Sequence, residues 1–263
     1  MVLDFCKYQG TGNDFIIIDN RTDFFDRNNS TLIEALCNRR LGIGADGLIL
    51  LQKSLSDDFE MIYYNADGRE STMCGNGGRC IVSFANSMGL IKDNKVGFLA
   101  VDGQHSAFIN EKRSIELGMK DVKNVERRGA DFFLNTGSPH YVVLVEDVNE
   151  IDVFERGREI RYSEEFVNEG TNVNFVQIIA EKQIKVRTYE RGVEAETWSC
   201  GTGVTAAAIA VSVHLKNSIA HYFVSTRGGA LEVKFTPQIS DNSFMDIFLI
   251  GPTVEVYKGQ IVI

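Results

Sequence analysis

Residues 69–78 read RESTMCGNGG, and residues 195–204 read AETWSCGTGV. In each stretch a glutamate, Glu70 or Glu196, comes four residues before a cysteine, Cys74 or Cys200, and that cysteine opens a Cys-Gly-x-Gly turn. The two cysteines are 126 residues apart. Similarity at one fixed spacing is the signature of an internal repeat, and it decides how the rest of the chain is interpreted.

Two further pairs of segments match in the same order. TGNDFIIID from Thr11 is similar to TGSPHYVVLVE from Thr136, and ADGLILL from Ala45 falls opposite GTNVNFVQ from Gly170, each at an offset of 125 residues. We therefore predict two homologous αβ units that form a pseudo-twofold pair, with one residue inserted in the second. The first unit is expected to cover residues 1–118 and the second residues 119–259, with a last strand, residues 260–263, crossing back to complete the first.

Runs of β-branched and aromatic residues predict that strands outnumber helices. Strands are expected around residues 15–18, 48–51, 61–64, 141–145, 174–179 and 231–235. A helix is predicted over residues 31–40 behind a Ser30 cap, with Leu32, Ile33, Leu36 and Cys37 on one face. Helical spacing also follows each repeated cysteine, so these apolar faces should be buried: Gly77, Ile81, Phe84, Ala85 and Met88 in the first copy, and Val204, Ala207, Ala208, Val211 and Leu215 in the second.

Length, composition and charge narrow the class of protein. The chain has 263 residues, which at about 150 residues per domain suggests two domains. Its formal net charge of −9 disfavours binding to nucleic acid or to anionic lipid. The most apolar stretch, residues 204–213, is half of the roughly 20 residues that cross a bilayer, and the amino terminus has no secretory pattern. Five cysteines at irregular spacing suit reduced thiols, so we expect a cytoplasmic protein.

The repeated cysteines are each predicted to lie at the start of a helix. Helix amino termini carry unpaired N–H donors and partial positive charge, so they attract carboxylates and lower the pKa of a nearby thiol. Glycines in the first turn let a ligand approach the backbone. Two such ends brought face to face would hold a carboxylate between two sulfurs. A thiolate could then remove a Cα proton while a thiol delivers one to the opposite face, which inverts the centre.

Two other interpretations of the cysteines remain open. A single Cys-Gly-x-Gly turn can be a packing turn, although the repeat favours a function for both copies. A zinc site built from Cys74, Cys80, Cys200 and His140 is conceivable, but the sequence has no Cys-x2-Cys pair. Cys6, Cys37 and Cys80 lie within apolar patterns typical of core residues.

The ordered set of motifs GTGNDFIIID, NADG, CGNGGRC, TGSPHYV, NVNFV, YERGVEAET and CGTG resembles the diaminopimelate epimerase family from Lys7 to about Gly229. The resemblance implies an α/β protein of α+β type, with two pseudosymmetric domains, each a curled, mostly antiparallel sheet around a central helix. It also implies a metal-free reaction with no cofactor that interconverts LL- and meso-diaminopimelate for lysine and peptidoglycan synthesis. Family members often form homodimers.

Roles for individual residues follow from the same resemblance. Cys74 and Cys200 match the two catalytic acid/bases, and His140 and Glu190 match the polar pair that assists them and holds the substrate amino group. First-turn donors to the reacting carboxylate would be Gly75, Asn76, Gly201 and Thr202. The residues that match substrate-recognition positions are Asn13, Asn65, Asn172 and Arg191, and the planar fork of Arg191 suits the distal carboxylate.

Several of these positions have a structural alternative. Asn13 and Asn65 lie where turn asparagines are common, His140 could be a satisfied structural residue, and Glu190 with Arg191 could be a solvated turn pair. The chain also departs from the family pattern at Ser138, at Gly47 and by one extra residue between Glu190 and Cys200. The alternatives for function are a related racemase or epimerase of another amino acid, similar to proline racemase, and a thiol-based metal-binding protein.

Overall fold

The computed structural model describes residues 2–216, 219–238 and 242–263. Contacts divide the chain into two compact units. Unit 1 is formed by Met1–Leu117 and Gly251–Ile263, and unit 2 by Gly118–Ile250. The chain therefore returns to unit 1 nine residues before residue 260, where the sequence analysis placed the return.

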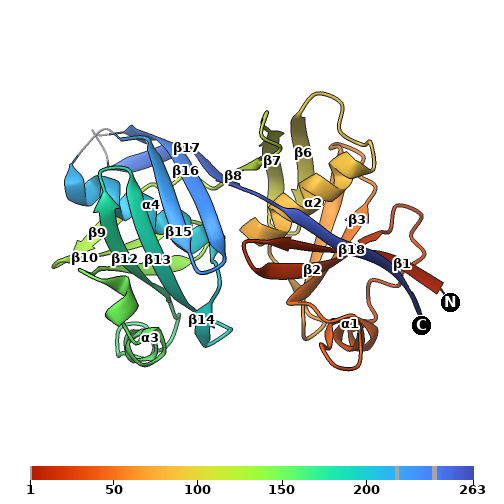
Figure 1. The fold of residues 1–263 in the computed structure, drawn as a ribbon, viewed down its shortest axis with the longest axis horizontal. Helices are drawn as coiled ribbons and strands as arrows, with labels where there is room; N and C mark the ends of the chain where they lie inside the picture. Colours follow the sequence, from red (N-terminus) through yellow and green to blue (C-terminus); the bar gives the residue numbers. More distant parts are fainter. Residues whose placement is uncertain (1, 217–218, 239–241) are drawn as a thin grey trace. The chain divides into compact units, whose positions relative to one another are not determined.

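Unit 1 is a sheet with two helices (Figure 1). Its strands β1 and β18 pair along nearly their whole length, which ties the two ends of the chain together. The strands are β1 (Val2–Gly10), β2 (Asn13–Asp19), β3 (Gly47–Gln52), β4 (Phe59–Asn65), β5 (Glu70–Ser71), β6 (Lys95–Ala100), β7 (Gly103–Ile109), β8 (Ile115–Gly118) and β18 (Val254–Val262). The helices are α1 (Ser30–Cys37) and α2 (Gly75–Ser87).

Unit 2 has the same kinds of element in a similar order. Its strands are β9 (Val125–Arg128), β10 (Asp131–Asn135), β11 (Pro139–Leu144), β12 (Asn172–Ala180), β13 (Gln183–Glu190), β14 (Ala195–Thr197), β15 (His221–Thr226), β16 (Gly229–Gln238) and β17 (Ser243–Gly251). Its helices are η1 (Val148–Glu150), α3 (Val153–Arg161) and α4 (Gly201–Leu215).

The internal repeat is visible in the strand pairings of the two units. Strands β2 and β3 are parallel, as are β11 and β12, and the antiparallel pair β3–β4 corresponds to β12–β13. The parallel pair β4–β6 likewise corresponds to β13–β15, and the antiparallel pair β6–β7 to β15–β16. Most pairings in each unit are antiparallel, and the predicted mixed α+β class is confirmed.

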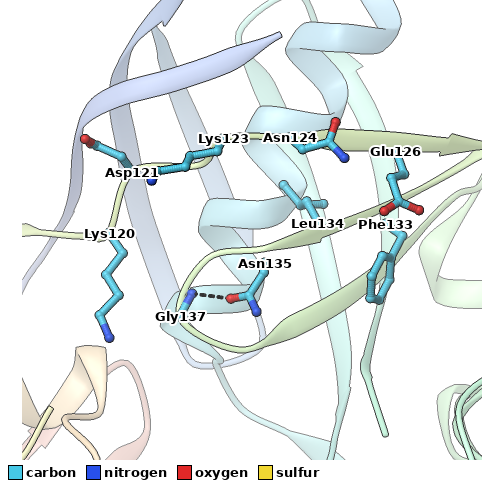
Figure 2. A pocket seen from close by; sticks show the side chains of 9 residues that line it. All are labelled: Lys120, Asp121, Lys123, Asn124, Glu126, Phe133, Leu134, Asn135 and Gly137. Carbon is cyan, nitrogen blue, oxygen red and sulfur yellow. Dashed lines mark hydrogen bonds between the residues drawn. The ribbon is translucent and has the colours of Figure 1, made fainter. Parts of the chain in front are cut away.

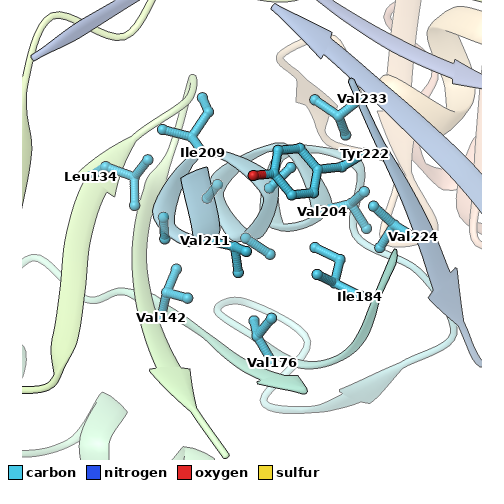
Figure 3. Close-up of a cluster of buried hydrophobic side chains, with 14 of the residues drawn as sticks. Leu134, Val142, Val176, Ile184, Val204, Ile209, Val211, Tyr222, Val224 and Val233 are labelled. Carbon is cyan, nitrogen blue, oxygen red and sulfur yellow. The ribbon is translucent and has the colours of Figure 1, made fainter. Parts of the chain in front are cut away.

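Each of the two helices that follow a repeated cysteine is buried in the core of its unit. Helix α4 is buried at almost every position from Gly201 to Ser212, and its side chains pack against the inward faces of the surrounding strands (Figure 3). Because water contacts no side of this segment, it carries apolar and small residues all round. No helix in the described ranges is long and apolar enough to cross a membrane.

The ends of these two helices differ from the sequence prediction. Met88 is the C-cap of α2 and is 43% exposed, and Leu215 is the last residue of α4 and is 37% exposed. Both fit the helical spacing, but each lies at the carboxyl end of its helix. The other predicted members of the two apolar faces are buried, as expected.

The predicted helix over residues 31–40 also has different bounds. Asn29, not Ser30, is the N-cap, and its side chain accepts a hydrogen bond from Leu32 N at 3.0 Å. The helix ends at Cys37, because Asn38 adopts an extended conformation and its side chain accepts bonds from the N–H groups of the following turn. Ile33, Leu36 and Cys37 are buried as predicted, and Leu32 is half-buried.

The residue inserted in unit 2 is absorbed by a turn. In unit 1 Tyr63 pairs with Ser71, three residues before Cys74, and in unit 2 Thr188 pairs with Thr197, three residues before Cys200. The extra residue therefore lies in the loop of residues 191–194 and does not change the register of the strands that lead into the cysteine. The extra residue between Glu190 and Cys200 therefore leaves the two cysteine turns equivalent.

Helix α3 approaches β13 closely at Gly157. A Cβ atom at this position would lie 2.4 Å from Tyr189 Cβ, a contact that requires the helix or the strand to shift. We expect Gly157→Ala to lower the free energy of unfolding by about 1–3 kcal/mol, because overpacking outweighs the gain in helix propensity. Thermal and denaturant unfolding would measure this loss. Gly97→Ala is the matched control, since its nearest neighbour is a side-chain oxygen of Asp57 at 3.3 Å. An equal loss in both variants would contradict the packing argument.

Candidate active site

Cys74 is the N-cap residue of α2, and its side chain makes no capping hydrogen bond. It follows the short β4–β5 hairpin, which places the helix start at the end of the sheet. Gly78 in the first turn packs against Met73 and Leu117, with a Cβ atom there 2.9 Å from Met73 Sδ. This glycine is thus required for packing as well as for the open first turn that the sequence predicted.

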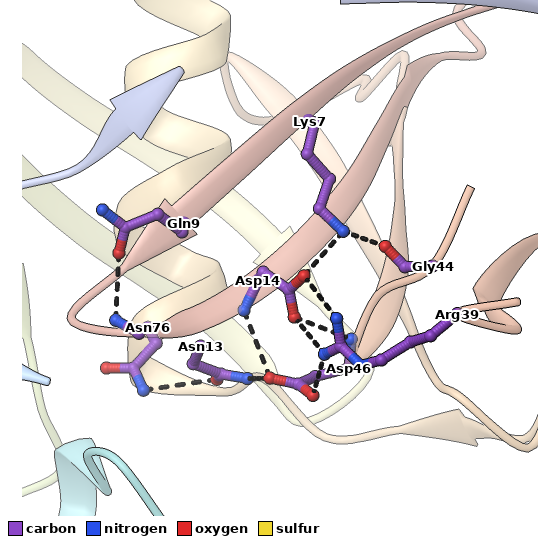
Figure 4. Close-up of polar contacts among 9 residues, drawn as sticks. Lys7, Gln9, Asn13, Asp14, Arg39, Gly44, Asp46 and Asn76 are labelled. Carbon is purple, nitrogen blue, oxygen red and sulfur yellow. Dashed lines mark hydrogen bonds and ion pairs between the residues drawn. The ribbon is translucent and has the colours of Figure 1, made fainter. Parts of the chain in front are cut away.

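An asparagine on a neighbouring strand contacts the Cys74 sulfur. Cys74 Sγ lies 3.6 Å from Asn13 Oδ1, which also accepts a hydrogen bond from Asn76 Nδ2 at 3.3 Å. Asn13 Nδ2 donates to Asp46 Oδ2 at 2.7 Å (Figure 4). This bond fixes the amide so that its oxygen faces Cys74. The predicted site residues Asn13, Cys74 and Asn76 therefore form one connected group.

Behind this group lies a network of charges that holds the β1–β2 hairpin. Burial raises the pKa of Asp14, but hydrogen bonds and charges from Arg39 and Lys7 outweigh it and lower that pKa to about 2. Arg39 also pairs with Asp46 at 2.7 Å, and Lys7 donates to the Gly44 carbonyl oxygen (Figure 4). Because Arg39 holds Asp46, and Asp46 accepts from Asn13, these contacts also fix the orientation of the Asn13 side chain.

Asn65 is exposed at the end of β4, where its backbone closes the turn that leads to β5. It stands opposite Gly47 in the β3–β4 pair. A Cβ atom on Gly47 would lie 2.5 Å from the Tyr64 carbonyl oxygen and 2.6 Å from the Tyr63 ring. Tyr63 thus fills the space that a side chain at Gly47 would need, which explains how the sheet accommodates this departure from the family pattern.

Cys200 is the N-cap of α4 and is buried, with 7% of its surface exposed. Its Sγ lies 3.4 Å from Thr202 Oγ1, and Thr202 Oγ1 lies 3.4 Å from Ser138 Oγ. Gly203 permits the close approach of α4 to β12, since a Cβ atom there would lie 2.3 Å from Asn174 Oδ1. The second cysteine therefore has hydroxyl groups where the first has amides.

His140 is completely buried next to the Ser138 hydroxyl group. Its Nδ1 lies 3.1 Å from Asn174 Nδ2, which also donates to the Tyr141 carbonyl oxygen, so the amide nitrogen faces the ring. Nδ1 is therefore an acceptor, and the ring proton on Nε2 donates to Ser138 Oγ at 3.0 Å. Burial lowers the pKa of His140 to about 3, with a smaller contribution from the charge of Arg191. His140 is thus a neutral donor that orients Ser138.

Asn172 joins this group to the predicted recognition residues. It donates from Nδ2 to Ser138 Oγ at 3.2 Å, and its Oδ1 accepts from the Arg191 backbone N–H at 2.9 Å. The Arg191 guanidinium is exposed and donates to the Glu169 carbonyl oxygen at 2.7 Å. Glu190, next to it, is half-buried at the end of β13. The site residues predicted in unit 2 therefore form a second connected group around α4.

A family model described as diaminopimelate epimerase matches residues 5–123 and 132–252. The chain belongs to the diaminopimelate epimerase family. The resemblance seen in the sequence is confirmed, and so is the prediction of an enzyme of the isomerase class.

Curated members of this family match along nearly their whole length. A diaminopimelate epimerase from Flavobacterium psychrophilum is 51% identical over 97% of this chain and 98% of its own. One from Chlorobaculum tepidum is 43% identical over 96% of this chain and 98% of its own. Among solved structures, a PhzF-family phenazine biosynthesis protein from Bacillus anthracis has a TM-score of 0.80 at 16% identity and covers all of both chains. A hydroxyproline epimerase from Agrobacterium vitis has a TM-score of 0.67 at 13% identity, with 99% and 92% covered. These two likenesses show the fold alone.

Three polar residues of the two groups were not predicted from the sequence. Ser138 was noted only as a departure from the family pattern, yet it contacts His140, Asn172 and Thr202. The repeat could have identified it, because Ser138 is 125 residues after Asn13. Asn174 could have been identified because it is two residues after Asn172, so the alternation of a strand places both side chains on the same face. Arg79 could have been identified because it is the one charged residue between Cys74 and Ser87.

Two features of the structure lie apart from these groups. A cavity of about 360 Å3 in unit 2 is lined by Lys120, Lys123, Glu126, Phe133 and Asn135 among others, and includes none of the predicted site residues (Figure 2). Cys80 is a completely buried core residue, as predicted, and burial raises the pKa of its thiol to about 12. The described residues contain no group of three or more His, Cys, Asp or Glu side chains that could hold a metal ion.

The buried His140 should make stability depend on pH. Its pKa is about 3 in the folded protein and about 6.5 when unfolded, so the unfolded chain binds the additional proton and stability falls as pH falls below 6.5. Between pH 6.5 and 5 we expect a loss of about 2 kcal/mol from this residue. His140→Gln, which keeps a donor toward Ser138, should remove that part of the loss in denaturant unfolding. An NMR titration in which the His140 ring protonates near pH 6.5 would contradict the assignment.

Proposed function

We propose that this chain interconverts LL- and meso-diaminopimelate without a cofactor, as a cytoplasmic enzyme that supplies lysine and peptidoglycan synthesis. The observation that carries the proposal is the recurrence, in two units of the same topology, of a cysteine at the start of a buried helix. Membership of the diaminopimelate epimerase family supports the substrate. We further propose that the enzyme is a homodimer.

In the proposed reaction one cysteine is a thiolate and the other a thiol. The thiolate removes the Cα proton of the substrate and becomes a thiol. The second thiol then donates its proton to the opposite face of the same carbon and becomes a thiolate. The configuration is inverted and the total number of protons is unchanged.

The negative charge that develops on the substrate carboxylate requires donors that are already in place. We assign this role to the first-turn N–H groups at Gly75 and Asn76, and at Gly201 and Thr202, because the N–H groups of the first turn point out of the amino-terminal end of a helix. Fixed donors of this kind stabilise developing charge without reorganisation. Positioned acid/base groups typically contribute about 10²–10⁴-fold, so much of the remaining barrier must be lowered by this electrostatic stabilisation.

The rest of the substrate has two charged amino acid ends to recognise. We assign the distal carboxylate to Arg191, whose planar guanidinium can bind a carboxylate through two parallel hydrogen bonds. Asn13, Asn65 and Asn172 would bind the polar ends, and Glu190 would accept from the substrate amino group. In this assignment His140 acts through Ser138, because it is neutral and buried.

The test is solvent exchange. Incubation with LL-diaminopimelate in D2O should place deuterium at Cα and yield the meso isomer, measured by mass spectrometry and chiral chromatography. Cys74→Ala and Cys200→Ala should each reduce turnover by at least about 10²-fold, because each removes one acid/base group. Cys80→Ala is the matched control, since that buried thiol lies on the same helix as the first turn and is not assigned to the reaction.

Two outcomes would contradict the proposed function. An active Cys74→Ala protein would exclude the two-base reaction. Activity on proline but not on diaminopimelate would instead favour a related racemase, for which Arg191 would have no distal carboxylate to bind.

If the two thiols face one substrate, they should also react with each other in the empty enzyme. Mild oxidation is expected to form a Cys74–Cys200 disulfide with loss of activity, and a reductant should restore it. Peptide mapping would identify the bond. Activity that is unchanged by oxidation would count against the proposed closeness of the two sulfurs.

A further inference from the structure

Arg79 on α2 is a fully buried arginine, with no exposed surface. Its guanidinium donates to the Gly75 carbonyl oxygen at 3.3 Å, to Thr11 Oγ1 at 3.3 Å and to Asn76 Oδ1 at 3.0 Å. Its Nε has no hydrogen-bond partner among the described residues. All of the partners are neutral, so this cation is buried without a carboxylate within ion-pair distance in the described ranges.

A buried charge of this kind requires an opposite charge. An arginine remains protonated, and an uncompensated buried ion costs several kcal/mol. Burial lowers the pKa of Arg79, whereas the charges of ionised Cys80 and Cys74 raise it. Cys80 is completely buried and its pKa is about 12, so it remains neutral near pH 7. Of the two thiols, Cys74 is therefore the one whose ionisation can balance the guanidinium.

A short chain of hydrogen bonds connects Arg79 to this sulfur. Arg79 Nη2 donates to Asn76 Oδ1, Asn76 Nδ2 donates to Asn13 Oδ1, and that oxygen lies 3.6 Å from Cys74 Sγ. The amide oxygen of Asn13 can accept from a thiol but offers nothing to a thiolate. Stabilisation of a Cys74 thiolate must therefore come from the amino terminus of α2 and from the positive charge of Arg79.

The second unit lacks this charge. Residue 205 corresponds to residue 79 in the repeat, and it is a threonine. Thr205 is buried and donates to the Gly201 carbonyl oxygen at 3.0 Å, the counterpart of the bond from Arg79 to Gly75. The hydrogen bond is thus repeated but the charge is not. The charged groups near the end of β13 are the exposed Arg191 and the half-buried Glu190, which have opposite signs.

We propose that Arg79 is a positioning residue that supplies the counter-charge for Cys74, so that the resting enzyme carries its thiolate on Cys74 and its thiol on Cys200. The two units of the repeat then share a scaffold but differ in the resting state of their cysteines. This inference rests on the proposed two-base function. Its direct readout is the ionisation of the thiols, which needs no substrate.

Other charged groups around Cys74 belong to the elements packed against it. Asp102 accepts from the Met73 backbone N–H at 3.3 Å and contacts His105 Nε2 at 3.1 Å, and Asp46 holds Asn13. Glu70 lies on β5, before the turn. The carboxylates oppose a thiolate on Cys74, so Arg79 must outweigh them, and variants of Arg79 leave all of them unchanged.

The test is the pH dependence of alkylation of each cysteine by iodoacetamide, because the thiolate is the reacting form. Each sulfur is measured alone, Cys74 in a Cys200→Ser protein and Cys200 in a Cys74→Ser protein, so that the two titrations do not mix. With native Arg79, Cys74 should have the lower midpoint. Arg79→Gln should move the Cys74 midpoint up by about one pH unit, a tenfold loss of thiolate below it, and leave Cys200 unchanged.

Two variants separate charge from packing. Arg79→Lys retains the positive charge and should keep the Cys74 midpoint near that of the native enzyme. Thr205→Val removes the equivalent hydrogen bond in unit 2 and should not move the Cys74 midpoint. Equal shifts in Arg79→Gln and Arg79→Lys would show a structural role only. If Arg79→Gln does not fold, a lower midpoint for Cys200 than for Cys74 with native Arg79 would by itself overturn the proposal.

Turnover provides an independent readout. In Arg79→Gln the acidic limb of the kcat/KM profile should move to higher pH. The shift should be the same for both directions of the reaction, because the ratio of the two kcat/KM values is fixed by the equilibrium constant. If the alkylation midpoints of Cys74 and Cys200 differ as expected but the protein does not act on diaminopimelate, the proposed function is contradicted and the role of Arg79 is not. Full activity with identical alkylation profiles in all variants would contradict only the role of Arg79.

Discussion

The burial of α2 and α4 is the constraint on which the rest of the structure depends. Each helix is enclosed by the strands of its own unit, and its N-cap residue is a cysteine at the sheet end. Because packing fixes the helix, it also fixes the direction of the N–H groups at its start. The sulfur and its donors are therefore placed by apolar contacts along the whole helix and not by a flexible loop.

The same scaffold carries different polar residues in the two units. At positions related by the repeat, Asn13 corresponds to Ser138 and Arg79 to Thr205. Unit 1 surrounds its cysteine with amides and a buried cation, whereas unit 2 surrounds its cysteine with hydroxyl groups held by a neutral histidine. Such divergence changes the chemistry of the sulfur while the backbone stays the same, because the side chains lie at equivalent places: Arg79 and Thr205 on the buried helices, Asn13 at the start of β2 and Ser138 directly before β11.

The departures from the family pattern are local for the same reason. The inserted residue falls in the loop after β13 and leaves the pairing of Thr188 with Thr197 intact. At Gly47 the missing side chain is replaced by the ring of Tyr63. Ser138 accepts hydrogen bonds from His140 and Asn172, so it has become the centre of the unit 2 group. Each change is compensated by a neighbour within the same hairpin or strand pair.

The sequence by itself determined the repeat, the strand-rich class and the two cysteine turns, because periodicity and recurrence at a fixed spacing need no tertiary information. It also indicated most residues of both polar groups through the family motifs. Only the tertiary structure decided which helix ends are exposed, as at Met88 and Leu215, and which histidine proton is present. Ser138 and Arg79 acquire their importance from contacts with residues far along the chain, such as Ser138 with Thr202 and Arg79 with Thr11. Burial and hydrogen-bond partners across strands are properties of the folded packing, and no local pattern encodes them.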